Sequence, residues 1–153
     1  MKKPDAINII FIASTPEKVW AALTDTALSK SYFFGNSVEL DAEVGGRFVV
    51  RQPDGSIAVD GKVLALEKAR LLRIEWNVVS VAELKDKPPA IIEYRVESVG
   101  EAVKLSVCEF HTWDVPEKFK EAGRNGWALI LSGVKSILET GKPLPTVKME
   151  PPK

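Results

Sequence analysis

The middle of the chain is a run of short segments in which apolar and polar residues alternate, and this run limits the possible folds more than any other feature. In the clearest segment, 72–78, apolar positions alternate with Arg73, Glu75 and Asn77. An alternation of period two buries one face of a strand and leaves the other in water, as in antiparallel sheets. Further strands are predicted over 7–13, 47–52, 57–66, 92–97 and 103–108.

Helical patterns lie at the two ends of this run. The pair Thr15-Pro16 is typical of a helix start, because a hydroxyl caps free backbone N–H groups and proline fits the first turn. A second short helix is expected over 27–31. Near the other end, apolar residues recur at helical spacing over 127–138. We expect the stretch 123–126, with its two glycines, to separate this helix of about 16 residues from a short one near Phe119.

Helices that are separated from a continuous antiparallel run predict the α+β class. A sheet of six to seven strands must cover one of its faces, and the C-terminal helix is the long amphipathic element able to do so. We therefore expect a curved antiparallel sheet wrapped around that helix, with two short helices after the first strand. The length of 153 residues fits a single domain, 1–153, with a core over about 7–142 and a loose tail over 143–153.

Composition excludes several function classes. Lys plus Arg and Asp plus Glu each total 21, so the chain lacks the net positive field that nucleic acids select. One cysteine and one histidine, Cys108 and His111, can form neither an internal disulfide nor a structural zinc site. Because no apolar run reaches about 18 residues and no signal-peptide pattern is present, we expect a cytoplasmic monomer or homodimer without membrane insertion.

No sequence motif indicates a cofactor or a metal. The chain has no phosphate-binding loop, dinucleotide fingerprint, His-Glu-x-x-His or Gly-x-Ser-x-Gly sequence. Glu109 and His111 would share the inward face if their strand kept its alternation, and could then orient a ligand hydroxyl or act as a catalytic acid–base pair. Alternatively, the strand ends there and both side chains reach solvent. Cys108 has the opposite parity from His111, which disfavours a Cys–His nucleophile.

Aromatic residues mark the expected interface between the sheet and the C-terminal helix. Strand and helix phases point Trp76, Tyr94 and Trp127 toward this interface, where aromatic side chains either pack as core or line a ligand site. Phe33 and Phe34, in the loop after the short helices, are candidates for the mouth of such a site. The full set of candidate ligand-binding residues is Phe33, Phe34, Phe48, Trp76, Tyr94, Glu109, His111, Trp127 and Leu131.

Two blocks of the sequence resemble the activator of heat-shock-protein-90 ATPase homologue family, which lies within the helix-grip superfamily of START-related and birch-pollen-allergen-like (SRPBCC) domains. The first block is 14–25, with its Pro-Glu, Val-Trp and Leu-Thr-Asp pieces, and the second is the closing helix 126–141. Between them, Gly45-Gly46-Arg47-Phe48, Gly61-Lys62-Val63 and Ile74-Glu75-Trp76 lie where related sequences have similar pieces.

The resemblance implies a helix-grip fold with an internal cavity between the sheet and the C-terminal helix, which the superfamily uses for apolar ligands. It therefore favours the binding of a small hydrophobic or aromatic molecule, lipid-like or polyketide-like. Two alternatives stay open at this point. One is a cyclase- or hydrolase-type enzyme that uses Glu109 and His111 in the same cavity. The other is a chaperone- or stress-related protein-interaction module, with contact to a chaperone.

Overall fold

The computed structural model describes residues 2–145 and contains one sheet of seven antiparallel strands, as the α+β prediction requires. The strands follow the order β1-β7-β6-β5-β4-β3-β2, so that the first and second strands form the two edges. The strands are β1 (Ala6–Ile12), β2 (Ser37–Leu40), β3 (Arg47–Arg51), β4 (Ile57–Glu67), β5 (Leu71–Trp76), β6 (Ala90–Val99) and β7 (Ala102–Phe110), and the helices are α1 (Pro16–Thr24), α2 (Thr26–Ser29) and α3 (Glu117–Thr140).

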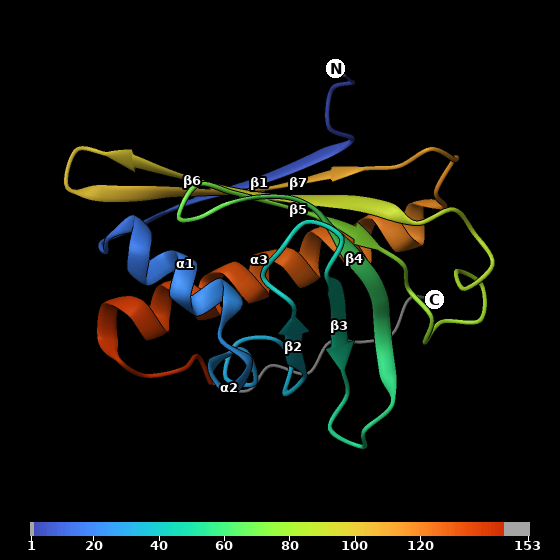
Figure 1. Cartoon of the computed structure of the whole chain (residues 1–153), viewed down its shortest axis with the longest axis horizontal. Coiled ribbons are helices and arrows are strands. Elements are labelled where there is room, and N and C mark those ends of the chain that lie inside the picture. Colours follow the sequence, from blue (N-terminus) through green and yellow to red (C-terminus); the bar gives the residue numbers. More distant parts are fainter. Residues whose placement is uncertain (1, 146–153) are drawn as a thin grey trace.

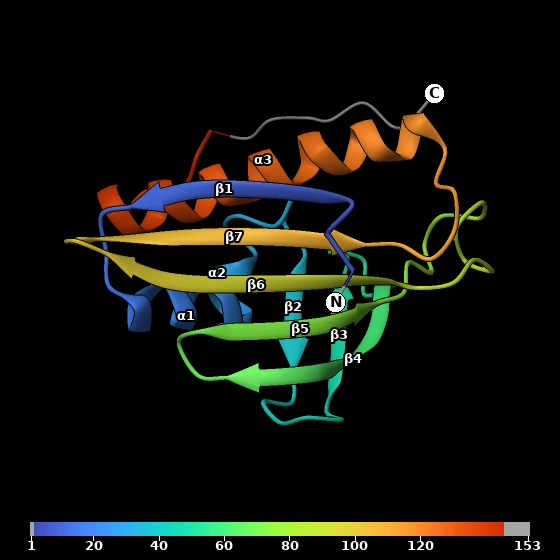
Figure 2. The same ribbon diagram turned by 90° about the horizontal axis from the view of Figure 1, so that it is seen from above.

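The three helices lie on one side of the sheet. Figure 1 shows β4 bending downward, so that β2 and β3 lie beside the helices while β1, β7, β6 and β5 lie above them. Seen from above, these upper strands run side by side, with α1 and α2 behind them and α3 along the edge strand β1 (Figure 2). The prediction of a curved sheet wrapped around the C-terminal helix is therefore confirmed. The predicted tail, 143–153, falls for its larger part outside the described residues.

The C-terminal helix is longer than the sequence predicted. α3 runs without interruption for 24 residues, so the stretch 123–126 is helical and does not separate two helices. Each glycine within a helix costs about 1 kcal/mol relative to alanine. Burial of Trp127, Ile130 and Leu131 against the sheet offsets this cost, which is why the predicted break does not occur. The helix ends at Gly141, whose φ of 77° suits glycine.

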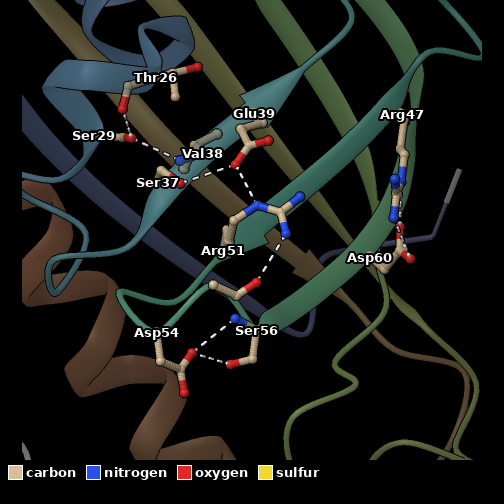
Figure 3. A network of polar contacts seen from close by, with 11 residues as sticks. Thr26, Ser29, Ser37, Val38, Glu39, Arg47, Arg51, Asp54, Ser56 and Asp60 are labelled. Atoms are coloured by element: carbon tan, nitrogen blue, oxygen red, sulfur yellow. Dashed lines mark hydrogen bonds and ion pairs between the residues drawn. The ribbon is translucent and has the colours of Figure 1, made fainter.

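Hydrogen bonds fix the start and the end of the loop 30–36, which joins α2 to β2. The Ser29 hydroxyl donates to the Thr26 carbonyl at 2.6 Å and accepts the backbone N–H of Val38 at 2.8 Å (Figure 3). Val38 lies in the edge strand β2, so Ser29 satisfies a backbone donor that would otherwise be orphaned in the interior. The loop therefore leaves α2 and enters the sheet at fixed positions.

The middle of the same loop packs closely on α3. The Tyr32 hydroxyl donates to the Ala22 carbonyl at 2.7 Å, which ties the loop to α1. A Cβ atom placed on Gly133 would lie only 2.8 Å from Tyr32 Cβ, so glycine is what allows the helix to approach the loop this closely. Phe33 and Phe34 follow directly, and the loop therefore presents them beside the helix.

The outer face of the sheet carries a buried acid between two arginines. Glu93 has a side-chain exposure of 4%, and its carboxylate accepts from Arg73 at 3.1 Å and from Arg95 at 3.3 Å. Both arginines point outward, as the alternation of their strands predicts. Cys108 pairs with Glu93 across β6 and β7 and is also buried. Burial raises the pKa of the Cys108 thiol, which keeps it protonated and unreactive.

Candidate functional site

Five aromatic side chains from five parts of the chain meet between the sheet and α3, and we call them the aromatic cluster. Trp127 lies at its centre, with ring centroids 5.4 Å from Trp76, 5.8 Å from Tyr94 and 6.1 Å from Phe33. Trp76 also contacts Phe48 at 5.8 Å and Phe33 at 6.2 Å. The tilted and edge-to-face arrangements are those that aromatic quadrupoles favour.

The elements that carry the aromatic cluster explain its position. Tyr94 has the same parity as the buried residues Ile92 and Val96 of β6, so its ring points toward α3. Leu131 follows Trp127 by one helical turn and is also buried in the core, at 1% exposure. Burial raises the pKa of the Tyr94 phenol well above its ordinary value, so the hydroxyl stays neutral. The inward orientation predicted for these side chains is what the structure shows.

The members of the aromatic cluster differ in their exposure to solvent. Trp76 is partly exposed, whereas Phe33 is 5% exposed. Phe34 is 45% exposed and stacks edge-on against Phe33, with centroids 6.3 Å apart. Phe34 also has a φ of 57°, a left-handed conformation that costs a residue with a Cβ atom of order 1 kcal/mol or more. Phe34 is therefore an exposed ring on a strained backbone, next to a member of the aromatic cluster.

Glu109 points inward at one end of the aromatic cluster. It has the same parity as Val107 of β7 and pairs across the sheet with the buried Ile92. Its carboxyl oxygen lies 3.6 Å from where a Cβ of Gly123 would be, so this glycine of α3 leaves room for the carboxyl group. Burial raises the pKa of Glu109, and the Trp127 indole and the Arg124 guanidinium lower it by less. The site therefore combines aromatic rings with one partly buried acid.

His111 has different surroundings from Glu109, although the sequence suggested a shared face. β7 ends at Phe110, and the backbone N–H of His111 donates to the Asp5 carboxylate at 2.7 Å. Lys2 donates to the His111 carbonyl. Burial lowers the pKa of the imidazole, while the Asp5 carboxylate raises it by less. The strand alternation thus carries Glu109 to the interior, and His111 lies beyond the strand end, against the N-terminal segment.

Sequence reasoning missed the role of Gly123. It read the glycine as a helix break, whereas the residue is helical and faces the carboxyl of Glu109. The available signal was its position four residues before Trp127, on the same face of the helix. Within residues 2–145, no group of three potential metal-ligating side chains occurs, and no helix has the length and apolar character needed to cross a membrane.

A family model described as activator of Hsp90 ATPase homolog 1-like protein matches residues 13–139. No curated protein matches the chain significantly. Among solved structures, CalU16 from Micromonospora echinospora is 23% identical, with a TM-score of 0.71 over 91% of this chain and 76% of that chain. The Aha1 dimer from Colwellia psychrerythraea is also 23% identical, with a TM-score of 0.70 over 89% of this chain and 96% of that chain.

A third structure is PFC0360w, an HSP90 activator from Plasmodium falciparum. It is 20% identical, with a TM-score of 0.70 over 87% of this chain and 94% of that chain. At such identities the solved structures establish a common helix-grip fold, while the family model spans most of the sequence. The chain therefore belongs to the activator of Hsp90 ATPase homolog 1-like family.

Proposed function

We propose that this protein binds a small apolar or aromatic molecule between the sheet and α3, at the aromatic cluster. The observation that carries the proposal is the position of Trp76. Its ring contacts Phe33, Phe48 and Trp127, which come from a loop, a strand and a helix, and it remains partly exposed. Desolvation drives such binding, because each 100 Å² of apolar surface removed from water contributes about 2.5 kcal/mol.

The loop 30–36 is the element that opens for the ligand. The rings of the aromatic cluster lie in contact, so binding requires one of them to move. Phe33 is the cluster member on this loop, and its neighbour Phe34 is exposed on a strained backbone, which makes a movement of this segment less costly than that of a buried strand. The hydrogen bond between Ser29 and Val38 and the bond from Tyr32 to Ala22 hold the rest of the loop in place while Phe33 and Phe34 move.

Titration with 1-naphthalenemethanol, a neutral aromatic probe, tests the proposal. Because naphthalene absorbs and emits in the range of tryptophan, binding is followed by isothermal titration calorimetry, and a saturable heat of binding is expected. Binding to the folded state alone also raises Tm, because a ligand at 100 times its Kd adds about 2.7 kcal/mol to the free energy of unfolding. If neither a binding heat nor a change of Tm is observed up to the solubility limit of the probe, the proposal is wrong.

Replacing Phe34 should weaken the binding of the probe without destabilising the protein. We expect F34A to raise the Kd for 1-naphthalenemethanol by about three- to tenfold, which corresponds to the loss of one aromatic contact. The free energy of unfolding should change by less than about 0.5 kcal/mol, because the ring is 45% exposed. Phe11, 51% exposed on the outer face of β1, supplies the matched control, and F11A should leave the Kd unchanged. If F34A and F11A changed the Kd equally, the probe would not bind beside Phe34 and the proposed site would be wrong.

A second candidate function is contact with a chaperone through the outer face of the sheet. Ile7, Ile9 and Phe11 form a row on β1 and are each about half exposed, at 51%, 48% and 51%. Exposed apolar rows of this kind favour partner contacts, and relatives of the same fold include HSP90 activators. Measuring the binding and the ATPase rate of purified Hsp90 with and without this chain tests the idea. An unchanged ATPase rate together with no detectable binding would exclude it.

A further inference from the structure

We infer that the molecule bound at the aromatic cluster carries a positively charged amine, which pairs with the carboxylate of Glu109. This inference rests on the proposed function and narrows it to one chemical class of ligand. A purely apolar ligand needs no acid beside it, and an acidic residue is costly to place in an interior. The presence of Glu109 against α3 is therefore the observation that needs an explanation.

Both elements that enclose the site, β7 and α3, determine the position of the Glu109 side chain. β7 directs the side chain inward beside the buried pair Val107 and Ile92, and its carboxyl oxygen lies against Gly123 on α3. Trp127, one turn further along the helix, brings its indole close enough to act on the carboxyl. A ligand that separates the rings of the aromatic cluster would thus meet this carboxyl group at the end of the site.

The charged groups nearest to Glu109 are already paired with others. Arg124 donates to Glu117 at 2.9 Å. Asp5 accepts from Lys2 at 3.2 Å and from the backbone of His111 at 2.7 Å. Arg124 is therefore shared with Glu117, and Asp5, itself an acid, adds negative charge beside Glu109 instead of a counter-ion. A cation carried by the ligand would supply one, and it would also offset the cost of ionising a half-buried acid.

The rings beside Glu109 favour the same charge. The face of an aromatic ring carries negative potential, and tryptophan attracts cations more strongly than phenylalanine or tyrosine. Trp76 and Trp127 lie 5.4 Å apart and tilted by 51°, so an amine entering between them meets the faces of indole rings. The acid and the indole rings both favour an ammonium group over a neutral or anionic one.

Three probes with one naphthalene ring test this inference: 1-naphthylmethylamine, 1-naphthalenemethanol and 1-naphthoic acid. At pH 7 they carry a positive charge, no charge and a negative charge. We expect the amine to bind the wild-type protein about tenfold more tightly than the alcohol, as a charged hydrogen bond implies, and the acid to bind most weakly. Wild-type protein that binds the amine no more tightly than the alcohol would overturn the inference.

Substitution of Glu109 tests whether this residue causes the preference for the amine over the alcohol. E109Q should bind the alcohol as the wild type does and should lose the tenfold preference for the amine. E97Q removes the same charge from an exposed position of β6, and it should retain the preference. A preference that survives E109Q would also overturn the inference. Failure of the proposed function is distinguishable from these outcomes, because then the neutral alcohol would not bind the wild type at all.

Discussion

We expect G61A to lower the free energy of unfolding by about 3 kcal/mol, as overpacking between two backbones does. Gly61 lies in β4 opposite Phe48 of β3. A Cβ atom at this position would lie 1.7 Å from the carbonyl oxygen of Glu75 in β5. The obstacle is backbone, not a flexible side chain, so one of the two strands has to move. Such a movement disturbs the junction of β3, β4 and β5, where Phe48 and Trp76 meet.

Urea unfolding of G61A beside G126A measures this effect. Gly126 is helical, and a Cβ atom there meets nothing within 4 Å, so G126A should raise the free energy of unfolding by up to about 1 kcal/mol. Identical substitutions should therefore act in opposite directions at the two positions. A loss below about 1 kcal/mol in G61A would show that β4 and β5 do not approach each other as closely as described.

Local sequence patterns were sufficient to predict the positions of most strands. Alternation of apolar and polar residues predicted most strands longer than four residues, and a high density of β-branched and aromatic residues predicted the first one, 7–13. The sequence does not predict β2, because its four residues do not alternate between buried and exposed positions. A backbone N–H of this edge strand, that of Val38, bonds to the Ser29 hydroxyl instead of to another strand. A glycine inside a strand commonly marks a bulge or a close approach of another backbone, and at Gly61 that backbone is Glu75 of β5.

The candidate site depends on contacts that no local pattern contains. Glu109 and Gly123 come from different elements, and their proximity follows from how α3 crosses the sheet. For the same reason, the helix was predicted too short: propensity favours a break at 123–126, while burial of Trp127 against three aromatic rings favours continuation. Tertiary packing outweighs propensity here, as it commonly does in helices.

The burial of the acid Glu93 on the outer face was also not visible in the sequence. Alternation predicted the outward direction of Arg73 and Arg95 but not their convergence on one carboxylate. The three residues come from β5 and β6, where Arg73 pairs directly with Glu93. Cross-strand register decides this contact, and register cannot be read from one strand alone.

W127A should cost about 3–5 kcal/mol of the free energy of unfolding, because it removes the side chain on which α3 and the sheet meet. Trp127 is 5% exposed and contacts Phe33, Trp76 and Tyr94. Truncation to alanine leaves a void bordered by three rings from a loop and two strands. W127F keeps an aromatic ring in this position and should cost less, about 1–2 kcal/mol.

Trp113 supplies the matched control for this substitution. It is only partly buried in the segment before α3, where its ring packs under the Lys87 ammonium group at 5.1 Å, so W113A should cost no more than about 1 kcal/mol. Urea unfolding followed by circular dichroism compares the three variants without relying on the altered tryptophan signal. Equal losses in W127A and W113A would mean that the aromatic cluster does not hold α3 to the sheet. The proposed ligand site would then lose its structural basis, because the rings that form it would not be packed together.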